Sequence, residues 1–232
     1  QEIGQFYGWV YEGIARTQDE LDGHATQQGA NVGDCLYKDI SGPEGTPDGV
    51  IDAYDQTVLG SGLPKVNFGL STHMEYKGFD LNISTYGVLN YHVSDDIYNS
   101  LNSCYGYGNK EVGMLDANRW SEDGSTYLSS VPRTYAANNA TLAWNDLFSS
   151  RKIQNAAYWK IANVELGYNF PDKWFGGYVS GVRLYVSAQN LYTFTGYHGY
   201  NVDYAGGTFT PGYNFCSFPS ARTFMAGLHF TF

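Results

Sequence analysis

Five stretches of this chain alternate strictly between apolar residues and polar or small ones, each over about ten positions. They cover residues 66–76, 79–90, 158–170 and 180–190, and the C-terminal stretch "ARTFMAGLHFTF". Because successive side chains of a β-strand point to opposite faces, this pattern predicts strands with one apolar face. About ten residues is the length that a tilted strand needs to cross a bilayer, and it exceeds the roughly 5–6 residues usual in soluble sheets.

The second face of these stretches distinguishes two classes of β protein. It consists mostly of Asn, Ser, Gly and Gln, with few charges, whereas a soluble β-sandwich would place Lys, Glu and Thr there. Charged residues make up only 16% of the chain, and its net charge of −10 argues against a nucleic-acid partner. The pattern therefore favours a membrane-spanning barrel, and a secreted carbohydrate-binding β-sandwich remains the alternative.

The connections between the expected strands alternate between short and long. Lys77-Gly78 makes a tight hairpin, and "PDKWFGGYVS" links the third strand to the fourth, with Gly176-Gly177 at the bend. Residues 91–157 and 192–221 form long connections. Short turns on the periplasmic side and long loops outside are typical of outer-membrane barrels.

Aromatic residues lie near both ends of the expected strands. Such residues settle at the two interfaces of a bilayer, so the pattern predicts two aromatic girdles. The short-turn girdle contains Tyr76, Phe79, Phe170, Trp174, Phe230 and Phe232, and the loop girdle contains Tyr91, Tyr158, Trp159, Tyr192, Phe194 and Phe224.

About five strands cannot close a membrane barrel, because the smallest such barrels have about eight. An open sheet edge in lipid leaves backbone groups unpaired, at several kcal/mol each. We therefore expect these strands to pair with further strands, on a second chain or on an upstream remainder. In this division, residues 1–65 are an extracellular loop region with an acidic Asp/Gly turn, and residues 66–232 are the strands and outer loops.

Six segments along the whole chain resemble one family. They are "GQFYGWVYEGI", "GDCLYKDISG" continuing to "DGVIDAYDQTVLGSGLPKVNFGL", "YKGFDLNISTYG", "SSRKIQNAAYWKIANVELGYNFP", "VRLYVSAQNLYTFTGYHGY" and "PSARTFMAGLHFTF". Together they resemble the C-terminal part of SusC/RagA-like TonB-dependent outer-membrane transporters. The resemblance implies an all-β fold, in which this chain supplies the last strands of a large antiparallel barrel of about 22 strands with a plugged lumen.

The same resemblance implies import of a large nutrient, an oligosaccharide or an oligopeptide, across the outer membrane of a Gram-negative bacterium. The implied partners are the upstream plug and strands, a SusD-like surface lipoprotein that acts as a lid, TonB through the plug, and membrane lipid. A passive or adhesive barrel is a further alternative, which would lack the plug and the TonB-contacting segment. The sequence contains no HExxH, GxSxG, P-loop or helix-opening GxGxxG motif, so we do not expect an enzyme.

Several residues are candidates for contact with cargo. Two Tyr- and Gly-rich stretches, 103–109 and 196–207, lie in the long connections, where the resemblance places loops above the lumen or against the lid. Tyrosine faces stack on sugars and also anchor protein interfaces, although outer loops can equally pack on themselves. The candidate ligand-contacting residues are Tyr105, Tyr107, Trp120, Tyr197, His198, Tyr200 and Tyr204. The candidate lumen-facing residues are Asn163, Glu165, Arg183, Tyr185 and Gln189.

The stretch "EGTPDGVIDAYD", residues 44–55, has oxygen-bearing residues at the spacing of a calcium loop. The ligands for Ca²⁺ or Mg²⁺ would be Glu44, Thr46, Asp48, the Val50 carbonyl, Asp52 and Asp55. Against this, the first ligand is Glu and the last is the shorter Asp, and the family resemblance implies a loop that begins at Asp39. A solvated acidic turn is the other interpretation, and no cofactor is required. The three cysteines, Cys35, Cys104 and Cys216, allow one disulfide and a free thiol, or three unpaired thiols.

Overall fold

The computed structural model describes residues 2–104, 109–114, 119–122, 129–134, 144–175, 179–203 and 206–231. The chain divides into two compact units. We name them the loop unit (Gln1–Leu63, His92–Gln154 and Ala205–Cys216) and the strand unit (Pro64–Tyr91, Asn155–Tyr204 and Ser217–Phe232). The boundary expected at residue 65 lies close to the division between Leu63 and Pro64. Most of the connection 91–157 belongs to the loop unit, whereas only residues 205–216 of the connection 192–221 do.

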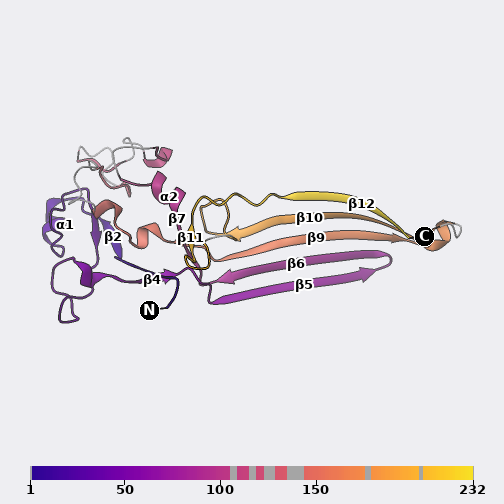
Figure 1. Ribbon diagram of the computed structural model, residues 1–232. Coiled ribbons are helices and arrows are strands. Elements are labelled where there is room, and N and C mark those ends of the chain that lie inside the picture. Colours follow the sequence, from indigo (N-terminus) through magenta and orange to yellow (C-terminus); the bar gives the residue numbers. More distant parts are fainter. Residues whose placement is uncertain are drawn as a thin grey trace. The chain divides into compact units, whose positions relative to one another are not determined.

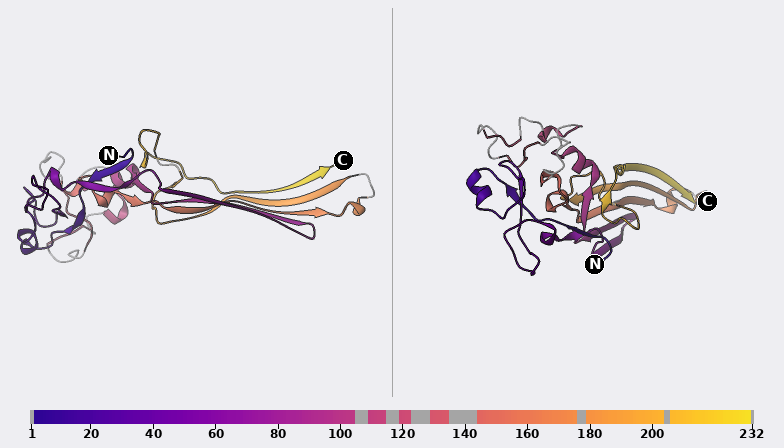
Figure 2. Two further views of the ribbon diagram at one scale, coloured as in Figure 1. Left: turned by 90° about the horizontal axis from the view of Figure 1, so that it is seen from below. Right: turned by 60° about the vertical axis from the view of Figure 1, so that its left-hand side comes forward.

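The strand unit is one antiparallel sheet in the order β12-β10-β9-β6-β5 (Figure 1). All five expected strands are present, and β10 continues beyond its expected end. Their bounds are β5 Val66–Tyr76, β6 Phe79–Leu89, β9 Tyr158–Phe170, β10 Gly181–Thr195 and β12 Thr223–Thr231, with the 3₁₀ turn η6 Asp172–Trp174 after β9. Both views in Figure 2 show the five strands side by side in a twisted sheet. The bend expected at Gly176-Gly177 lies outside the described residues.

The β5–β6 hairpin follows directly from its two-residue turn. Lys77 and Gly78 both have positive φ, 49° and 87°, which is the type I′ geometry that matches the twist of paired strands. This turn places Tyr76 opposite Phe79 and thereby sets the register of the whole β5–β6 pair. As a result, residues of like polarity in the two strands lie on the same face.

The two faces of the sheet differ sharply in chemistry. Large apolar side chains on one face are open to the surroundings: Leu70 is 64% exposed, Leu228 58% and Val186 51%. We call it the apolar face. The opposite face, the polar face, contains the ion pairs described below. A continuous band of exposed apolar side chains is rare on soluble monomers and marks a surface that contacts lipid or another protein.

A β-bulge interrupts the alternation in β9. Asn163 and Ile161 pair with consecutive residues of β6, so Ala162 between them has no partner there. The expectation that Ala162 continues the regular alternation is therefore wrong. The extra residue reverses the phase, which places Trp159 with Ile161 on the apolar face and turns Lys160 to the polar face.

Aromatic side chains do gather at both ends of the strands, with two corrections. On the apolar face Trp159 stacks on Phe194, with ring centroids 5.1 Å apart, while Phe79 packs against Tyr168 at the short-turn end. However, Tyr158 lies on the polar face because of the bulge, and both it and Tyr91 are buried, at 9% and 7% exposure. These two tyrosines therefore do not belong to an exposed girdle. Burial, followed by the nearby Asp203 carboxylate, raises the pKa of Tyr91 to about 12.

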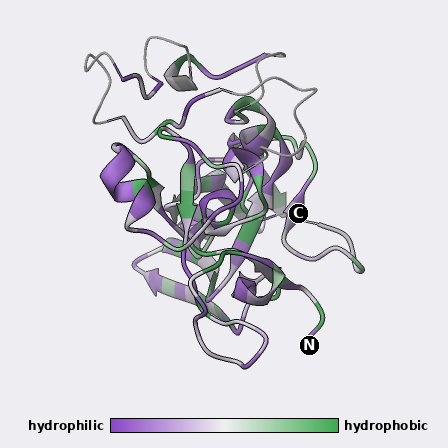
Figure 3. Ribbon diagram, turned by 90° about the vertical axis from the view of Figure 1, so that its left-hand side faces the viewer, coloured by the Kyte–Doolittle hydropathy of each residue, from purple (hydrophilic) through white to green (hydrophobic). Residues whose placement is uncertain are grey.

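The remaining elements are short. They form two-stranded sheets β1-β4 and β2-β3 and a three-stranded sheet β11-β7-β8. Thr17 caps α1 by accepting a hydrogen bond from the Glu20 N–H at 3.1 Å, and Asp95 caps α2 in the same way. Helices and turns on the viewer's side of Figure 3 include many hydrophilic residues. The bounds are β1 Gln5–Gly8, β2 Tyr11–Ile14, α1 Gln18–Asp22, β3 Cys35–Tyr37, η1 Ala53–Asp55, β4 Thr57–Ser61, β7 His92–Asp95, α2 Asp96–Leu101, η2 Val112–Met114, η5 Ser150–Lys152, β8 Gln154–Asn155 and β11 Tyr213–Asn214.

The loop unit has its own core. Tyr37 and Ile51 pack with Cys35, and the carboxylate of the preceding residue, Asp34, is 1% exposed. Arg133 binds that carboxylate through two N–H groups, at 2.6 and 2.9 Å. A buried carboxylate is tolerated here because it is both paired and hydrogen-bonded.

All three cysteines are unpaired, and Cys35 and Cys104 are buried. Burial raises the pKa of the Cys35 thiol to about 12, which favours the protonated thiol over the nucleophilic thiolate at neutral pH. Within the described part of the chain, no helix is long and apolar enough to span a membrane.

Candidate functional site

The polar face of the sheet contains a network centred on Arg183. Its Nε donates to Asp80 Oδ2 at 3.0 Å and its Nη2 donates to both Asp80 Oδ1 and Glu165 Oε1, the latter at 2.7 Å. Asn169 Nδ2 also donates to Asp80 Oδ2, at 3.1 Å. The planar guanidinium suits this arrangement because it can bind two carboxylates with separate N–H groups.

Two glycines make room for this network. A Cβ at Gly167 would lie 2.5 Å from both Arg183 Nη2 and Asp80 Oδ2, and a Cβ at Gly227 would lie 2.6 Å from the Tyr185 ring. The Arg183 guanidinium also lies over the Tyr185 ring, 5.3 Å from its centroid. Packing on the polar face therefore requires glycine at these two positions.

All five residues expected to face a lumen lie on the polar face. Asn163 pairs with Gln189 across β9 and β10. Tyr185 pairs with Gly167 in the same ladder, nearer the short-turn end. Glu165 and Arg183 join the network above. Sequence reasoning did not name Asp80 as their partner, although its place on the polar phase of residues 79–90 was a usable signal.

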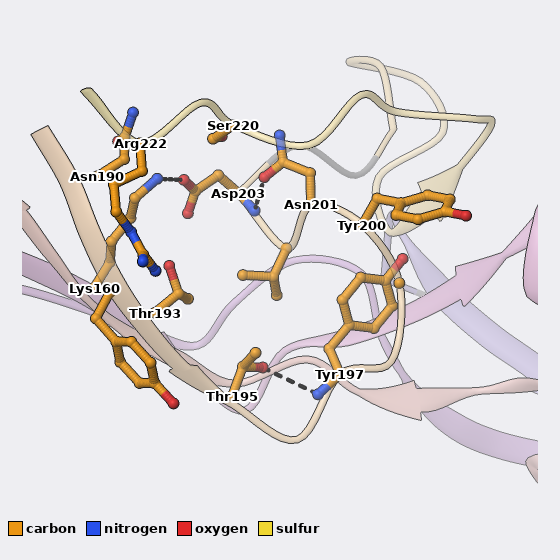
Figure 4. Close-up of a pocket in the computed structure, with 13 residues that line it drawn as sticks. Lys160, Asn190, Thr193, Thr195, Tyr197, Tyr200, Asn201, Asp203, Ser220 and Arg222 are labelled. Atoms are coloured by element: carbon orange, nitrogen blue, oxygen red, sulfur yellow. Dashed lines mark hydrogen bonds and ion pairs between the residues drawn. The ribbon is translucent and has the colours of Figure 1, made fainter. Parts of the chain in front are cut away.

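A pocket of about 320 Å³ opens in the strand unit at the long-loop end of β9 and β10 (Figure 4). Residues of β9 and β10 line it together with residues 197–203 and 220–222 of the connection between β10 and β12. Its lining is mostly polar and consists of Lys160, Asn190, Tyr192, Thr193, Thr195, Tyr197, Gly199, Tyr200, Asn201, Val202, Asp203, Ser220 and Arg222.

An ion pair fixes one wall of this pocket. The Lys160 ammonium donates to Asp203 Oδ2, and the Tyr86 hydroxyl donates to the same oxygen at 3.3 Å. The Lys160 side chain is only 4% exposed and that of Asp203 is 19% exposed. Figure 4 shows the contact between them. Asp203 thereby ties the loop after β10 to the polar face of β6 and β9.

A contact between β10 and the residue pair before β12 lies on the same side of the pocket as this ion pair. Asn190 adopts a positive φ of 52° at the irregularity in the β10 ladder, and its Nδ2 donates to the Ala221 carbonyl at 2.9 Å. This bond places Arg222 beside the strand. The Arg222 side chain is exposed and, among the described residues, makes no hydrogen bond or ion pair.

The candidate ligand-contacting residues separate into three groups. Tyr197 and Tyr200 line the pocket, with Tyr197 buried and Tyr200 68% exposed. His198 does not line it, and Trp120 is buried in the loop unit beside Gly33. Tyr105, Tyr107 and Tyr204 lie outside the described residues.

The acidic stretch is organised by backbone donors. Asp55 accepts from the N–H groups of Ile40, Ser41 and Asp52, and Asp52 in turn caps the η1 turn. Burial acts to raise the pKa of Asp55, but these N–H groups outweigh it and leave that pKa below its usual value.

The other expected ligands do not converge with them in the described structure. Glu44, Thr46, Asp48 and Val50 are exposed, and Gly49 N–H donates to Asp39 rather than closing the loop from residue 44. No group of three or more His, Cys, Asp or Glu that could hold a metal is present among the described residues. Cation binding at residues 44–55 therefore stays a prediction.

Comparisons with known proteins agree with one another. No family model matches the chain. It is 30% identical over its whole length to the TonB-dependent receptor P3 of Formosa agariphila, and 27% identical over 80% of its length to the TonB-dependent receptor SusC of Bacteroides thetaiotaomicron. It spans 22% and 17% of these relatives, about a fifth of their length.

Solved structures give the same result for the fold. The chain superimposes on a structure of the RagAB peptide transporter with a TM-score of 0.71, at 22% identity, covering 97% of this chain and 22% of that one. The RagAB peptide importer in its "closed-closed" state gives a TM-score of 0.67 over 96% of the chain. The chain thus shares the all-β fold of a segment of the RagAB structures, with a partial sheet.

Proposed function

We propose that this chain forms part of the wall and outer loops of a SusC/RagA-like nutrient importer, because it is similar to the TonB-dependent receptor P3 over its whole length and to SusC over 80% of it. The observation that supports this most directly is the sheet with one exposed apolar face and one polar face. In this role the apolar face contacts lipid and the polar face borders the lumen.

The edges of the sheet support a place within a larger barrel. β5 and β12 each pair on one side only within the described residues. In a bilayer each unpaired backbone group would cost several kcal/mol, so both edges pair with further strands of the transporter. The polar face, with its Arg183 network, then borders a plug.

The proposed activity involves no bond chemistry in this chain. The importer resides in the outer membrane of a Gram-negative bacterium. A SusD-like surface lipoprotein captures an oligomeric nutrient and closes over the barrel, and TonB opens the path by pulling on the plug. The residues described here hold the barrel shape and supply a pocket near the loop end, where cargo passes.

Growth of a deletion strain tests this proposal. Loss of the transporter should abolish growth on one class of oligomeric nutrient and leave growth on its monomer intact. Restoration should require both the reintroduced transporter and functional TonB. Unchanged growth on every oligosaccharide and oligopeptide tried, or restoration without TonB, would contradict active import and favour a passive or adhesive barrel.

A further inference from the structure

The charge balance of the pocket leaves one cation available. Of the charged lining residues, Lys160 and Asp203 neutralise each other, and the Lys160 ammonium is almost entirely buried. Arg222 is exposed and, within the described residues, unpaired. The pocket therefore presents a net positive group to whatever enters it, despite the net charge of −10 of the chain.

Neutral hydrogen-bonding groups surround this cation. Asn190, Thr193 and Ser220 line the same side of the pocket, and Figure 4 shows them grouped with Arg222. A guanidinium flanked by hydroxyl and amide groups suits a planar carboxylate, which it can bind through two parallel N–H groups.

The rest of the lining favours a sugar over an apolar side chain. The Tyr200 ring is 68% exposed, so its face is free to stack on a sugar, whereas the Tyr192 ring packs against Phe194 with centroids 4.7 Å apart. Val202 is the one aliphatic residue among the described lining residues, and it is 6% exposed. Among the described lining residues an apolar side chain would meet only Val202 and the tyrosine rings, whereas sugar hydroxyl groups would find hydroxyl and amide partners in Asn190, Thr193 and Ser220.

We propose that this pocket binds an acidic sugar residue of the imported oligomer, with Arg222 bound to the sugar carboxylate and a tyrosine face against the ring. The proposal rests on the proposed import function and specifies its cargo class. A volume of about 320 Å³ is at the lower end of ligand pockets, which fits an end group rather than a whole chain.

Binding to the intact, detergent-solubilised transporter with its lipoprotein partner provides the test. The probes are an oligogalacturonate, a neutral oligosaccharide of equal length and an acidic oligopeptide, measured by calorimetry. The wild type should prefer the oligogalacturonate. Arg222→Gln should weaken its binding about 10- to 100-fold, as expected for a lost charge-assisted pair, without weakening the neutral oligosaccharide.

Two further variants separate a local effect from misfolding. Lys77→Gln removes an equal charge at the opposite end of the sheet and should change no affinity. Tyr200→Ala should weaken both oligosaccharides. Equal binding of acidic and neutral oligosaccharides, Arg222→Gln without effect, or Arg222-dependent binding of the acidic peptide alone would each overturn the proposal. If one of these binding results were obtained while the transporter still imported a nutrient, the proposed transport function would stand. Absence of all TonB-dependent uptake would refute the transport function itself.

Discussion

The ion pair between Lys160 and Asp203 should hold the loop after β10 in place, and Asp203→Ala tests this. The variant leaves the Lys160 ammonium, 4% exposed, without its counter-charge and removes the acceptor of the Tyr86 hydroxyl. Removing one partner of a buried pair costs about 3–5 kcal/mol. Because the Asp203 side chain is 19% exposed and water can partly compensate, we expect about 3 kcal/mol.

Hydrogen exchange of the intact transporter in micelles measures this cost locally. A loss of about 3 kcal/mol raises the opening equilibrium of residues 196–203 about 150-fold. Adding Lys160→Met to Asp203→Ala should recover most of the protection, because the unpaired buried charge is then gone. Glu75→Ala, which removes a carboxylate that is 72% exposed, is the control and should leave the loop unchanged. An increase below threefold in Asp203→Ala would refute the reasoning.

Three other predictions concern the polar face and the acidic turn. Gly167→Ala should destabilise the barrel by about 1–3 kcal/mol in denaturant unfolding, since its Cβ would meet Arg183 and Asp80 at 2.5 Å. Gly69→Ala should not lower the stability, because its Cβ would meet no atom closer than 3.7 Å. Equal destabilisation by the two variants would contradict this prediction. Because the folded pKa of Asp55 is lowered, its stabilisation is complete above about pH 3.9 and is lost as the pH falls towards that lowered pKa. Protection factors of the Ile40, Ser41 and Asp52 amides should fall in that range, and should not do so in Asp55→Asn. If residues 44–55 bind a cation, EDTA should lower the protection of residues 39–55; unchanged protection would favour a solvated acidic turn held by the backbone N–H groups that Asp52 and Asp55 accept.

The strand architecture could be predicted because period-two alternation directly encodes the face of each side chain. The Lys77-Gly78 turn and the lengths of the five strands also followed from local chemistry. The β9 bulge could not be predicted in this way. A single unpaired residue, Ala162, reverses the phase, and only the neighbouring strands determine where that residue is accommodated.

The site was predicted in part for the same reason. Tyr197 and Tyr200, which line the pocket, could be named in advance because they lie in a Tyr- and Gly-rich stretch of a long connection. Lys160 was missed because regular alternation without the bulge would place it on the apolar face. Asp203 was missed because its partner, Lys160, lies on β9, 43 residues away in the sequence. Arg222 is an isolated cation in the sequence, and its availability depends on which other charges are already paired in space.

The claim that supports the whole account is that the apolar face contacts hydrocarbon and the polar face borders the lumen. Spin labels attached to single cysteines in the reconstituted transporter measure this directly, through collisions with oxygen dissolved in the bilayer. Labels at Leu166, Leu184 and Leu228 should collide frequently with oxygen, and labels at Asn163 and Gln189 should not. Equal accessibility at all five positions, or the reverse order, would contradict the account.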